Sequence, residues 1–141
     1  MIHHTPNTQK AVNELFRVLK AKGTASISVY YKNFIIKNYK YLRIIVKIFS
    51  FLFLNLGRGR LSFHQSNYKN IIKLYDGKGN PVGKAYTQNQ FHKILTKSGF
   101  NQIEFTYYFF PFRFLKIKLP LIIIKIFTHF FPFMMVANIR K

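Results

Sequence analysis

Two adjacent histidines, His3 and His4, are the residues of this chain best suited to acid–base chemistry. A neutral imidazole accepts or donates a proton near physiological pH, so either ring can act as a general base. Thr5 and Pro6 follow directly and favour a helix start, because Pro is tolerated at the first helical position. Two interpretations stay open: one histidine takes part in catalysis, or one caps this helix while the other packs in the loop.

The remaining composition excludes several kinds of site. The sequence has no cysteine, which excludes disulfides, thiolate metal ligands and a cysteine nucleophile. Its only acidic residues are Glu14, Asp76 and Glu104, so the five histidines have little carboxylate support. No metal site is predicted from this donor set.

The charge balance is strongly basic, with 23 Lys and Arg residues and a formal net charge of +20. Such a field attracts nucleic acid and anionic lipid whatever the fold. Only six of the basic residues are Arg, whose bidentate fork suits phosphate recognition, and the abundance of Lys, Ile, Phe, Asn and Tyr is typical of A/T-rich codons. Specific nucleic-acid binding is therefore not expected, whereas an anionic membrane surface stays open as a partner.

The histidines are followed by a helix and then a strand. A helix is predicted from an N-cap at Thr5 or Thr8 to a stop at Gly23, because apolar residues recur at helical spacing. "TASISVYY", residues 24–31, alternates apolar with small hydroxyl residues and predicts a strand. This order is typical of one step of an α/β sheet. The apolar helix positions are Val12, Leu15, Phe16 and Leu19.

Residues 33–70 form a basic insertion. From Asn33 to Leu56 apolar residues step alternately by four and three with lysines largely opposite, which predicts one amphipathic helix. "GRGRLSFHQSNYKN" after it is expected to be a loop, and "YDGKGNPVGKAY" a double turn. The helix has two interpretations: its apolar stripe packs on the sheet with the lysines in water, or it serves an apolar ligand or a membrane surface.

The last third of the chain repeats the helix and strand pattern. Thr87 and Gln90 form a capping box for a helix over 88–98, and Gly99 with Phe100 predicts a Schellman ending. A strand over 101–110, a helix over 120–131 and a final strand from 133 follow. The apolar run 119–136 is not expected to span a membrane, because it is interrupted by Pro120, Lys125, His129 and Pro132. With no secretory signal evident, a cytoplasmic location is expected, membrane association staying open.

These stretches together carry a resemblance to a known family. "IHHTPNTQKAVNELFRVLKAKGTASISVYYKN" resembles the segment of class I S-adenosylmethionine-dependent methyltransferases, the methyltransferase type 11-like group, that begins at the tip of the fourth strand. There a helix ends in "RVLKPGG" before the fifth strand, and this chain has "RVLKAKG". "YDGKGNPVGKAYTQNQFHKILTKSGF" resembles the stretch that precedes the sixth strand.

The resemblance implies a fold. The family has a Rossmann-like seven-stranded α/β sheet of order 3-2-1-4-5-7-6, in which strand 7 is antiparallel. Residues 1–141 would be a single partial domain that supplies strands 5, 6 and 7 with their flanking helices, and the N-terminal half of the sheet would be absent. The edge of strand 5 where strand 4 pairs would then be exposed.

The resemblance also implies roles for particular residues. His3 and His4 would lie at the strand-4 tip as catalytic candidates that contact the acceptor or remove its proton. His3 and Thr5 would lie beside S-adenosylmethionine. Tyr30, Tyr31 and Asn33, at the end of strand 5, would contact the methyl acceptor, a small or lipid-like molecule.

Two functions follow. The first is a truncated or split S-adenosylmethionine-dependent methyltransferase that is inactive alone, because no glycines here form the Gly-rich turn after a first strand that holds the cofactor. A separate N-terminal half would be its partner. The alternative is a non-enzymatic, strongly basic protein that binds an anionic membrane surface or nucleic acid.

Overall fold

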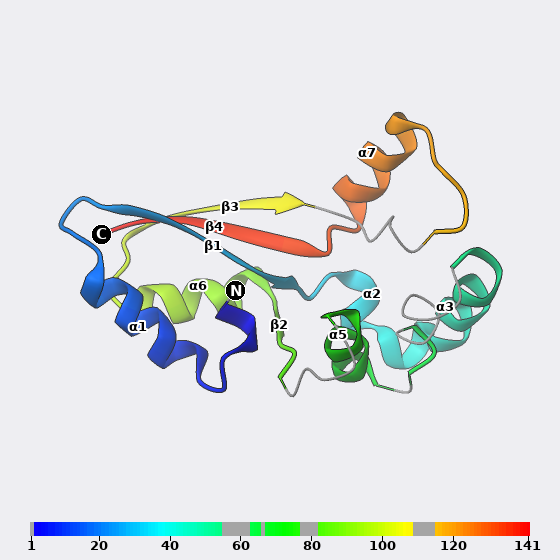
Figure 1. Ribbon diagram of the computed structural model, residues 1–141, viewed down its shortest axis with the longest axis horizontal. Coiled ribbons are helices and arrows are strands. Elements are labelled where there is room, and N and C mark those ends of the chain that lie inside the picture. The colour runs from blue at the N-terminus through cyan, green and yellow to red at the C-terminus, as the bar shows by residue number, and fades with distance from the viewer. Residues whose placement is uncertain (1, 55–62, 66, 77–81, 109–114) are drawn as a thin grey trace.

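A computed structural model of the chain describes residues 2–54, 63–65, 67–76, 82–108 and 115–141. It is a mixed α/β protein with one four-stranded sheet of order β2-β1-β4-β3 (Figure 1). β4 lies antiparallel between β1 and β3, and β2 pairs in parallel with the end of β1. The strands are β1 (Thr24–Tyr31), β2 (Ala85–Tyr86), β3 (Gln102–Tyr108) and β4 (Met134–Arg140).

One face of the sheet is covered by α1 (Thr8–Val18) and α6 (Gln88–Lys97), which lie together beneath it (Figure 1). Apolar residues alternate along the strands, so that every second side chain points towards these two helices. The core between the layers is closed, because its central residues are at most 7% exposed. They are Val12, Ile27, Val29, Phe91, Leu95, Phe100, Met135, Ala137 and Ile139.

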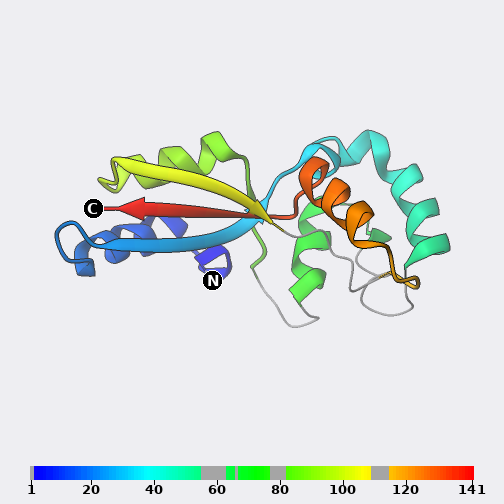
Figure 2. The same cartoon turned by 90° about the horizontal axis from the view of Figure 1, so that it is seen from above.

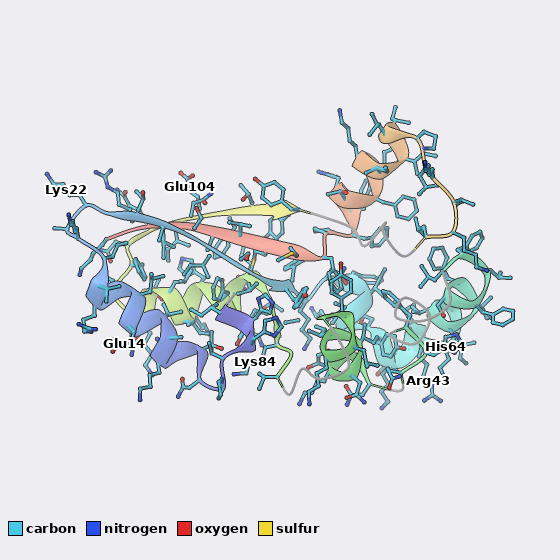
Figure 3. The ribbon with its side chains drawn as sticks, viewed as in Figure 1. Glu14, Lys22, Arg43, His64, Lys84 and Glu104 are labelled. Carbon is cyan, nitrogen blue, oxygen red and sulfur yellow. The ribbon has the colours of Figure 1, made fainter. Side chains whose placement is uncertain are left out.

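The opposite face of the sheet is polar near the start of β1. The strand register places Ser26 opposite Asn138, and Asn138 opposite Glu104. The hydroxyl of Ser26 donates a hydrogen bond to Asn138 Oδ1 at 2.7 Å. Figure 3 shows Glu104 on the side of the sheet turned away from α1 and α6. The predicted alternation of the first strand, with small hydroxyl residues on one face, is confirmed.

Both ends of α1 differ from the prediction. Its N-cap is Asn7, whose side chain accepts a hydrogen bond from the Lys10 amide, so the predicted caps Thr5 and Thr8 are wrong. Thr5 fails as a cap because its hydroxyl closes the preceding turn by donating to Ile2 O at 2.8 Å. At the other end the helix stops at Val18, before the predicted stop.

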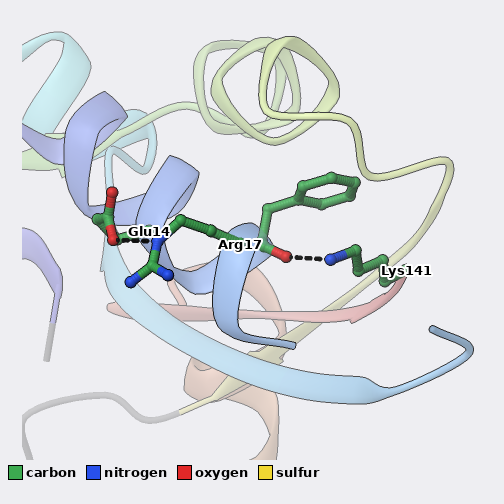
Figure 4. Close-up of polar contacts among 4 residues, drawn as sticks. Glu14, Arg17 and Lys141 are labelled. Carbon is green, nitrogen blue, oxygen red and sulfur yellow. Dashed lines mark hydrogen bonds and ion pairs between the residues drawn. The ribbon is translucent and has the colours of Figure 1, made fainter. Parts of the chain in front are cut away.

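The last residue of the chain ties the end of α1 to the sheet. Lys141 donates through Nζ to Phe16 O at 2.6 Å (Figure 4). The same ammonium group donates to Leu19 O at 2.9 Å. A lysine suits the end of a helix, where carbonyl groups lack partners in the next turn. The same figure shows the exposed ion pair between Glu14 and Arg17, in which Arg17 Nε lies 2.8 Å from Glu14 Oε2.

The ends of α6 are as predicted. Thr87 and Gln90 form the capping box, each side chain bonding the other residue's backbone amide. The Phe100 amide donates to Leu95 O and the Gly99 amide to Thr96 O, which is the hydrogen-bond pattern of a Schellman ending. Gly99 has φ 105°, in the left-handed region that favours glycine.

A second group of helices lies beyond the carboxyl end of β1 (Figure 2). The predicted single helix over 33–56 is wrong, because Asn38 separates two helices, and residues 55–56 lie outside the described part. The loop predicted over 57–70 is described only in part: residues 57–62 and 66 lie outside the described residues, and residues 68–70 begin a helix. In the double turn predicted over 75–86, residues 75–76 are helical and residues 77–81 lie outside the described part. The helices are α2 (Phe34–Lys37), α3 (Tyr39–Phe53), α5 (Tyr68–Asp76) and α7 (Leu121–Phe130).

A smaller core, centred on Tyr30 and Phe133 at the end of the sheet, includes residues of α2 and α5 and the residue that follows α3. Its other buried members are Ile36, Leu54, Ile72 and Tyr75. Among the described residues, none of the helices is both long enough and apolar enough to cross a membrane.

Candidate functional site

A cavity of about 890 Å³ lies where β1 and β3 end. Both strands run antiparallel to β4, so they are parallel to each other and their carboxyl ends meet at the same edge. This edge is where open α/β sheets bind ligands. The cavity is lined by Tyr31, Asn33 and Phe34, by Phe105 to Tyr108, and by Ile124, Lys125, Thr128, His129, Phe130 and Pro132.

Two tyrosines form the sheet side of this cavity. The rings of Tyr31 and Tyr107 are 4.9 Å apart in an edge-on contact. The Tyr107 hydroxyl donates to Gln88 Oε1 at 2.7 Å. Burial raises the pKa of Tyr107 above its ordinary value, and neighbouring Tyr31 adds to the shift. Tyr107 is therefore a neutral hydroxyl at physiological pH and can act as a hydrogen-bond partner there, but not as a base.

Asn33, which was predicted to contact the methyl acceptor, also has a structural role. Its Oδ1 accepts from the Ile36 amide at 3.0 Å and so caps α2, and its Nδ2 donates to Pro132 O at 3.0 Å. The residue is 5% exposed. Asn33 thus fixes the wall of the cavity between β1 and α7.

His3 and His4 lie in a short 3-10 helix, η1 (Ile2–His4), against the edge of β1. His3 is fully buried, and its Nδ1 donates to Ser28 O at 3.3 Å. His4 donates through Nδ1 to Val82 O at 2.9 Å. A carbonyl partner at Nδ1 selects the tautomer with the hydrogen on that nitrogen, so Nε2 carries the lone pair when the ring is neutral.

Tyr30 belongs to this histidine group. Its ring centre is 4.4 Å from that of His3 and 5.1 Å from that of Phe133, and the residue is only 2% exposed. Tyr75 stacks edge-on against it at 5.6 Å. Tyr30 is a core residue that supports the buried face of His3.

The structure thus divides the predicted site residues into two groups. His3, His4 and Tyr30 lie together beside η1, with Thr5 closing the turn. Tyr31 and Asn33 line the cavity at the strand ends, which neither histidine borders. Adjacent residues of an extended strand point to opposite faces, which explains why Tyr30 and Tyr31 belong to different groups. The predicted catalytic, cofactor and acceptor roles stay predictions.

Sequence reasoning missed the contribution of α7 to the cavity. Lys125, Thr128 and His129 line it, although β3 and α7 are separated by residues 109–120 along the chain. In the sequence, His129 stands out only as one of five scattered histidines and as a polar interruption of the apolar run 119–136. Its position on a predicted helix between two strands was the signal that it lies near the strand ends.

A second cavity of about 340 Å³ adjoins the first and shares Asn33 and Phe34 with it. It lies between α2, α3 and α7, and all its lining residues but Asn33 are apolar. A hydrocarbon chain is the ligand that suits such walls. The lining residues are Asn33, Phe34, Ile35, Ile36, Leu42, Ile45, Val46, Phe49, Leu54, Phe63, Phe127, Phe131 and Phe133.

A third cavity, of about 600 Å³, lies around β2 and is basic. Tyr86 in its wall shares a hydrogen bond of 2.7 Å with Thr8. Burial raises the pKa of Tyr86, and the bond to Thr8 opposes part of the shift. The lysines that line the cavity are Lys32, Lys69, Lys73, Lys84 and Lys93.

Within the described part of the chain, no three His, Cys, Asp or Glu residues gather in a metal-binding group. No family model matches the chain, and neither does any curated protein or solved structure compared with it. The site is thus an open cavity of mixed polar and apolar lining at the strand ends, with an apolar extension between helices.

Proposed function

We propose that this chain is the acceptor-binding half of a class I S-adenosylmethionine-dependent methyltransferase. The observation that supports it is the strand order β1-β4-β3, with β4 antiparallel between two parallel strands. This is the order 5-7-6, with an antiparallel strand 7, that the sequence resemblance implies.

The free edge of β1 is compatible with a fourth strand from another segment. β2 pairs only with Tyr30 and Tyr31, and η1 reaches the same edge at Ser28. Within the described residues, Thr24 to Ser26 of β1 have no strand partner on that side. A parallel strand that ended near η1 would fit this edge without displacing β2.

The residues present do not fit the cofactor by themselves. S-adenosylmethionine supplies the methyl group in this family, and its ribose and carboxylate need a Gly-rich turn and an acidic residue. None of Glu14, Asp76 and Glu104 borders the cavity at the strand ends. The cofactor is therefore assigned to the separate N-terminal half, and this chain contributes acceptor contacts.

The two adjoining cavities indicate the class of acceptor. Tyr31, Tyr107 and His129 offer polar groups at the strand ends, and the shared residue Asn33 leads into the apolar cavity. A lipid-like acceptor would place its reacting group in the first and its tail in the second. Substrate alignment of this kind supplies most of what methyl transfer needs from side chains.

The test begins with the DNA directly upstream of the Met1 codon, translated in all three frames. A Gly-rich strand-to-helix motif with a later acidic residue is expected there or in a neighbouring gene. Co-expression of that segment with this chain should give stoichiometric S-adenosylmethionine binding by calorimetry, and the chain alone should give none. Micromolar stoichiometric binding by the chain alone, or failure of the pair to bind, would contradict the proposal.

The alternative function, a non-enzymatic basic protein at a membrane or on nucleic acid, is favoured by one observation. Large apolar side chains lie exposed on α3 and α7 among lysines. A monodisperse monomer that melts cooperatively, and that no partner segment converts into a cofactor-binding pair, would favour this alternative.

A further inference from the structure

The outward sides of α3 and α7 carry an unusual density of exposed apolar side chains, which we call the apolar surface. On α3 the residues Tyr41, Ile44, Ile45 and Ile48 are each 57–79% exposed. No residue of α7 is buried. The further members of the surface are Phe51 and Leu52 on α3, with Leu121, Ile122, Ile126 and Phe130 on α7.

Helix geometry makes the α3 part of this surface continuous. At about 100° per residue, Tyr41, Ile48 and Leu52 fall on one line along the helix. The residues that anchor α3 to the protein, Tyr39 and Ser50, lie on the opposite side and are buried. The sequence pattern had placed lysines opposite a single apolar stripe, whereas α3 is apolar both inward and outward.

The α7 part lies at the same end of the molecule as the α3 part. Leu54 forms a backbone bridge with Leu115, and the Lys116 amide donates to Phe53 O at 3.0 Å, so the segment that leads into α7 is held at the end of α3. Phe127 of α7 and Phe49 of α3 line the same apolar cavity. Figures 1 and 2 both show the two helices at the same end of the molecule, beyond the sheet.

Cations border the apolar surface, and acids are absent from it. No Asp or Glu occurs between positions 33 and 54 or between 115 and 133. Figure 3 shows Arg43 projecting from the α3 region away from the sheet. At about 100° per residue, Lys40 and Lys47 fall on the flank of α3 between its packed and outward sides, and Arg43 falls closer to the packed side. The other cations of this region are Lys37, Lys116, Lys118 and Lys125.

We propose that the apolar surface docks on an anionic lipid membrane, with α3 and α7 lying in the interface. Helices bind there when outward apolar residues enter the headgroup boundary and flanking lysines meet anionic lipid, which is the arrangement found here. A second copy of the chain fits less well, because its +20 charge would repel this one. Nucleic acid would meet the cations but leave Ile44, Ile48 and Leu52 in water.

The proposal goes beyond methyl transfer and does not depend on it. If both proposals hold, the apolar cavity between α3 and α7 opens where the acyl region of the membrane lies, and a lipid-like acceptor can enter without crossing water. Failure of membrane docking would leave cofactor binding by a paired half unaffected, and failure of the pair would leave vesicle binding unaffected.

Tryptophan fluorescence tests the docking directly, because the chain has no tryptophan of its own. The variant Phe51→Trp places a probe on the apolar surface, and Val18→Trp places a control on α1, where Val18 is 61% exposed. Each full-length variant is mixed with phosphatidylcholine vesicles with and without phosphatidylglycerol, some with brominated acyl chains. We expect a blue shift and bromine quenching at position 51 with anionic vesicles, and neither at position 18.

Two pairs of variants separate insertion from charge attraction. The pair Ile44→Ser with Ile48→Ser should weaken vesicle partitioning about tenfold or more, and the control Val18→Ser should not. Lys40→Gln with Lys47→Gln should weaken binding to anionic vesicles by about fivefold per lysine, more than Lys20→Gln with Lys97→Gln, which remove the same charge elsewhere. Far-UV circular dichroism verifies that each variant is folded.

Three results would overturn the proposal. Complete release at about 0.5 M NaCl, where the Debye length is only a few Å, with no quenching at position 51, would mean charge attraction alone. Equal quenching at positions 51 and 18 would mean a different orientation. A concentration-dependent blue shift at position 51 without vesicles, matched by a larger mass in ultracentrifugation, would assign the surface to a second copy.

Discussion

The two ends of the molecule use apolar residues in opposite ways. In the sheet end, formed by β1, β3, β4, α1 and α6, they are enclosed between two layers, and the outer face of the sheet is polar near the start of β1. In the helical end, formed by α2, α3, α5 and α7, a small core coexists with a large exposed apolar surface. Exposed patches of this kind mark interaction sites, and for this reason we propose that the helical end, and not the closed sheet end, meets a partner.

The largest expected effect contrasts one core residue from the sheet end with one surface residue from the helical end. Phe91→Ala should lower the free energy of unfolding by about 3–5 kcal/mol, because it leaves a cavity in the closed core. Leu52→Ala, at a position 54% exposed, should change it by less than about 0.5 kcal/mol. Urea unfolding followed by circular dichroism measures both. A cost of several kcal/mol for Leu52→Ala would show that the apolar surface is packed in solution.

A smaller effect is expected at Gly99, whose left-handed backbone conformation ends α6 in the sheet end. Gly99→Ala forces an L-residue to φ 105° and brings Cβ to 2.7 Å from Phe16 Cζ, so we expect a loss of about 1–3 kcal/mol. Lys97→Ala, on the exposed side of α6, is the matched control and should change little.

The double variant with Phe16→Leu separates the two causes at this turn. If the ring contact dominates, Gly99→Ala costs less in the Phe16→Leu background than in the parent chain; if the left-handed φ dominates, the cost is unchanged. A cost below a few tenths of a kcal/mol in the parent chain would contradict the geometry of the Schellman ending.

The sheet end was largely predictable from the sequence because its signals are local. The capping box at Thr87 and the glycine at position 99 define α6, and alternation along 24–31 defines β1. The two predicted N-caps of α1, Thr5 and Thr8, lie two residues before and one residue after the observed cap Asn7. All three side chains can cap a helix, and tertiary contacts determine which of them does.

The helical end was less predictable because apolar residues occur on both the buried and the exposed sides of its helices, so their spacing does not indicate which side packs. α5 was missed although Asn67 precedes it and accepts a hydrogen bond from the Lys69 amide, a usable cap signal. β2 has two residues, too few for periodicity to show. The division of Tyr30 from Tyr31 and the approach of α7 to β3 depend on long-range packing, which spacing along the chain does not encode.

The smallest expected effect tests whether the two ends unfold together. Burial raises the pKa of Tyr86, and its hydrogen bond to Thr8 opposes part of the shift. Burial also raises the pKa of Tyr39, and the positive charge of Arg43 opposes part of that shift. Both tyrosines are protonated in folded and unfolded chains below their ordinary pKa of about 10, so stability is complete there and falls as pH rises through the folded values. Tyr39 also donates to Phe63 O and Gln65 O, contacts that opening of the helical end alone would break.

We therefore expect tyrosinate from Tyr39 to form at lower pH than the loss of sheet structure, because the helical end has the smaller core and opens first. Tyr86 should ionise only as the sheet unfolds. Ultraviolet absorbance of Tyr39→Phe and Tyr86→Phe, each subtracted from that of the parent chain, isolates the two transitions. Transitions that coincide would mean that the two ends form one cooperative unit, and the exposed helices would then owe their order to the sheet.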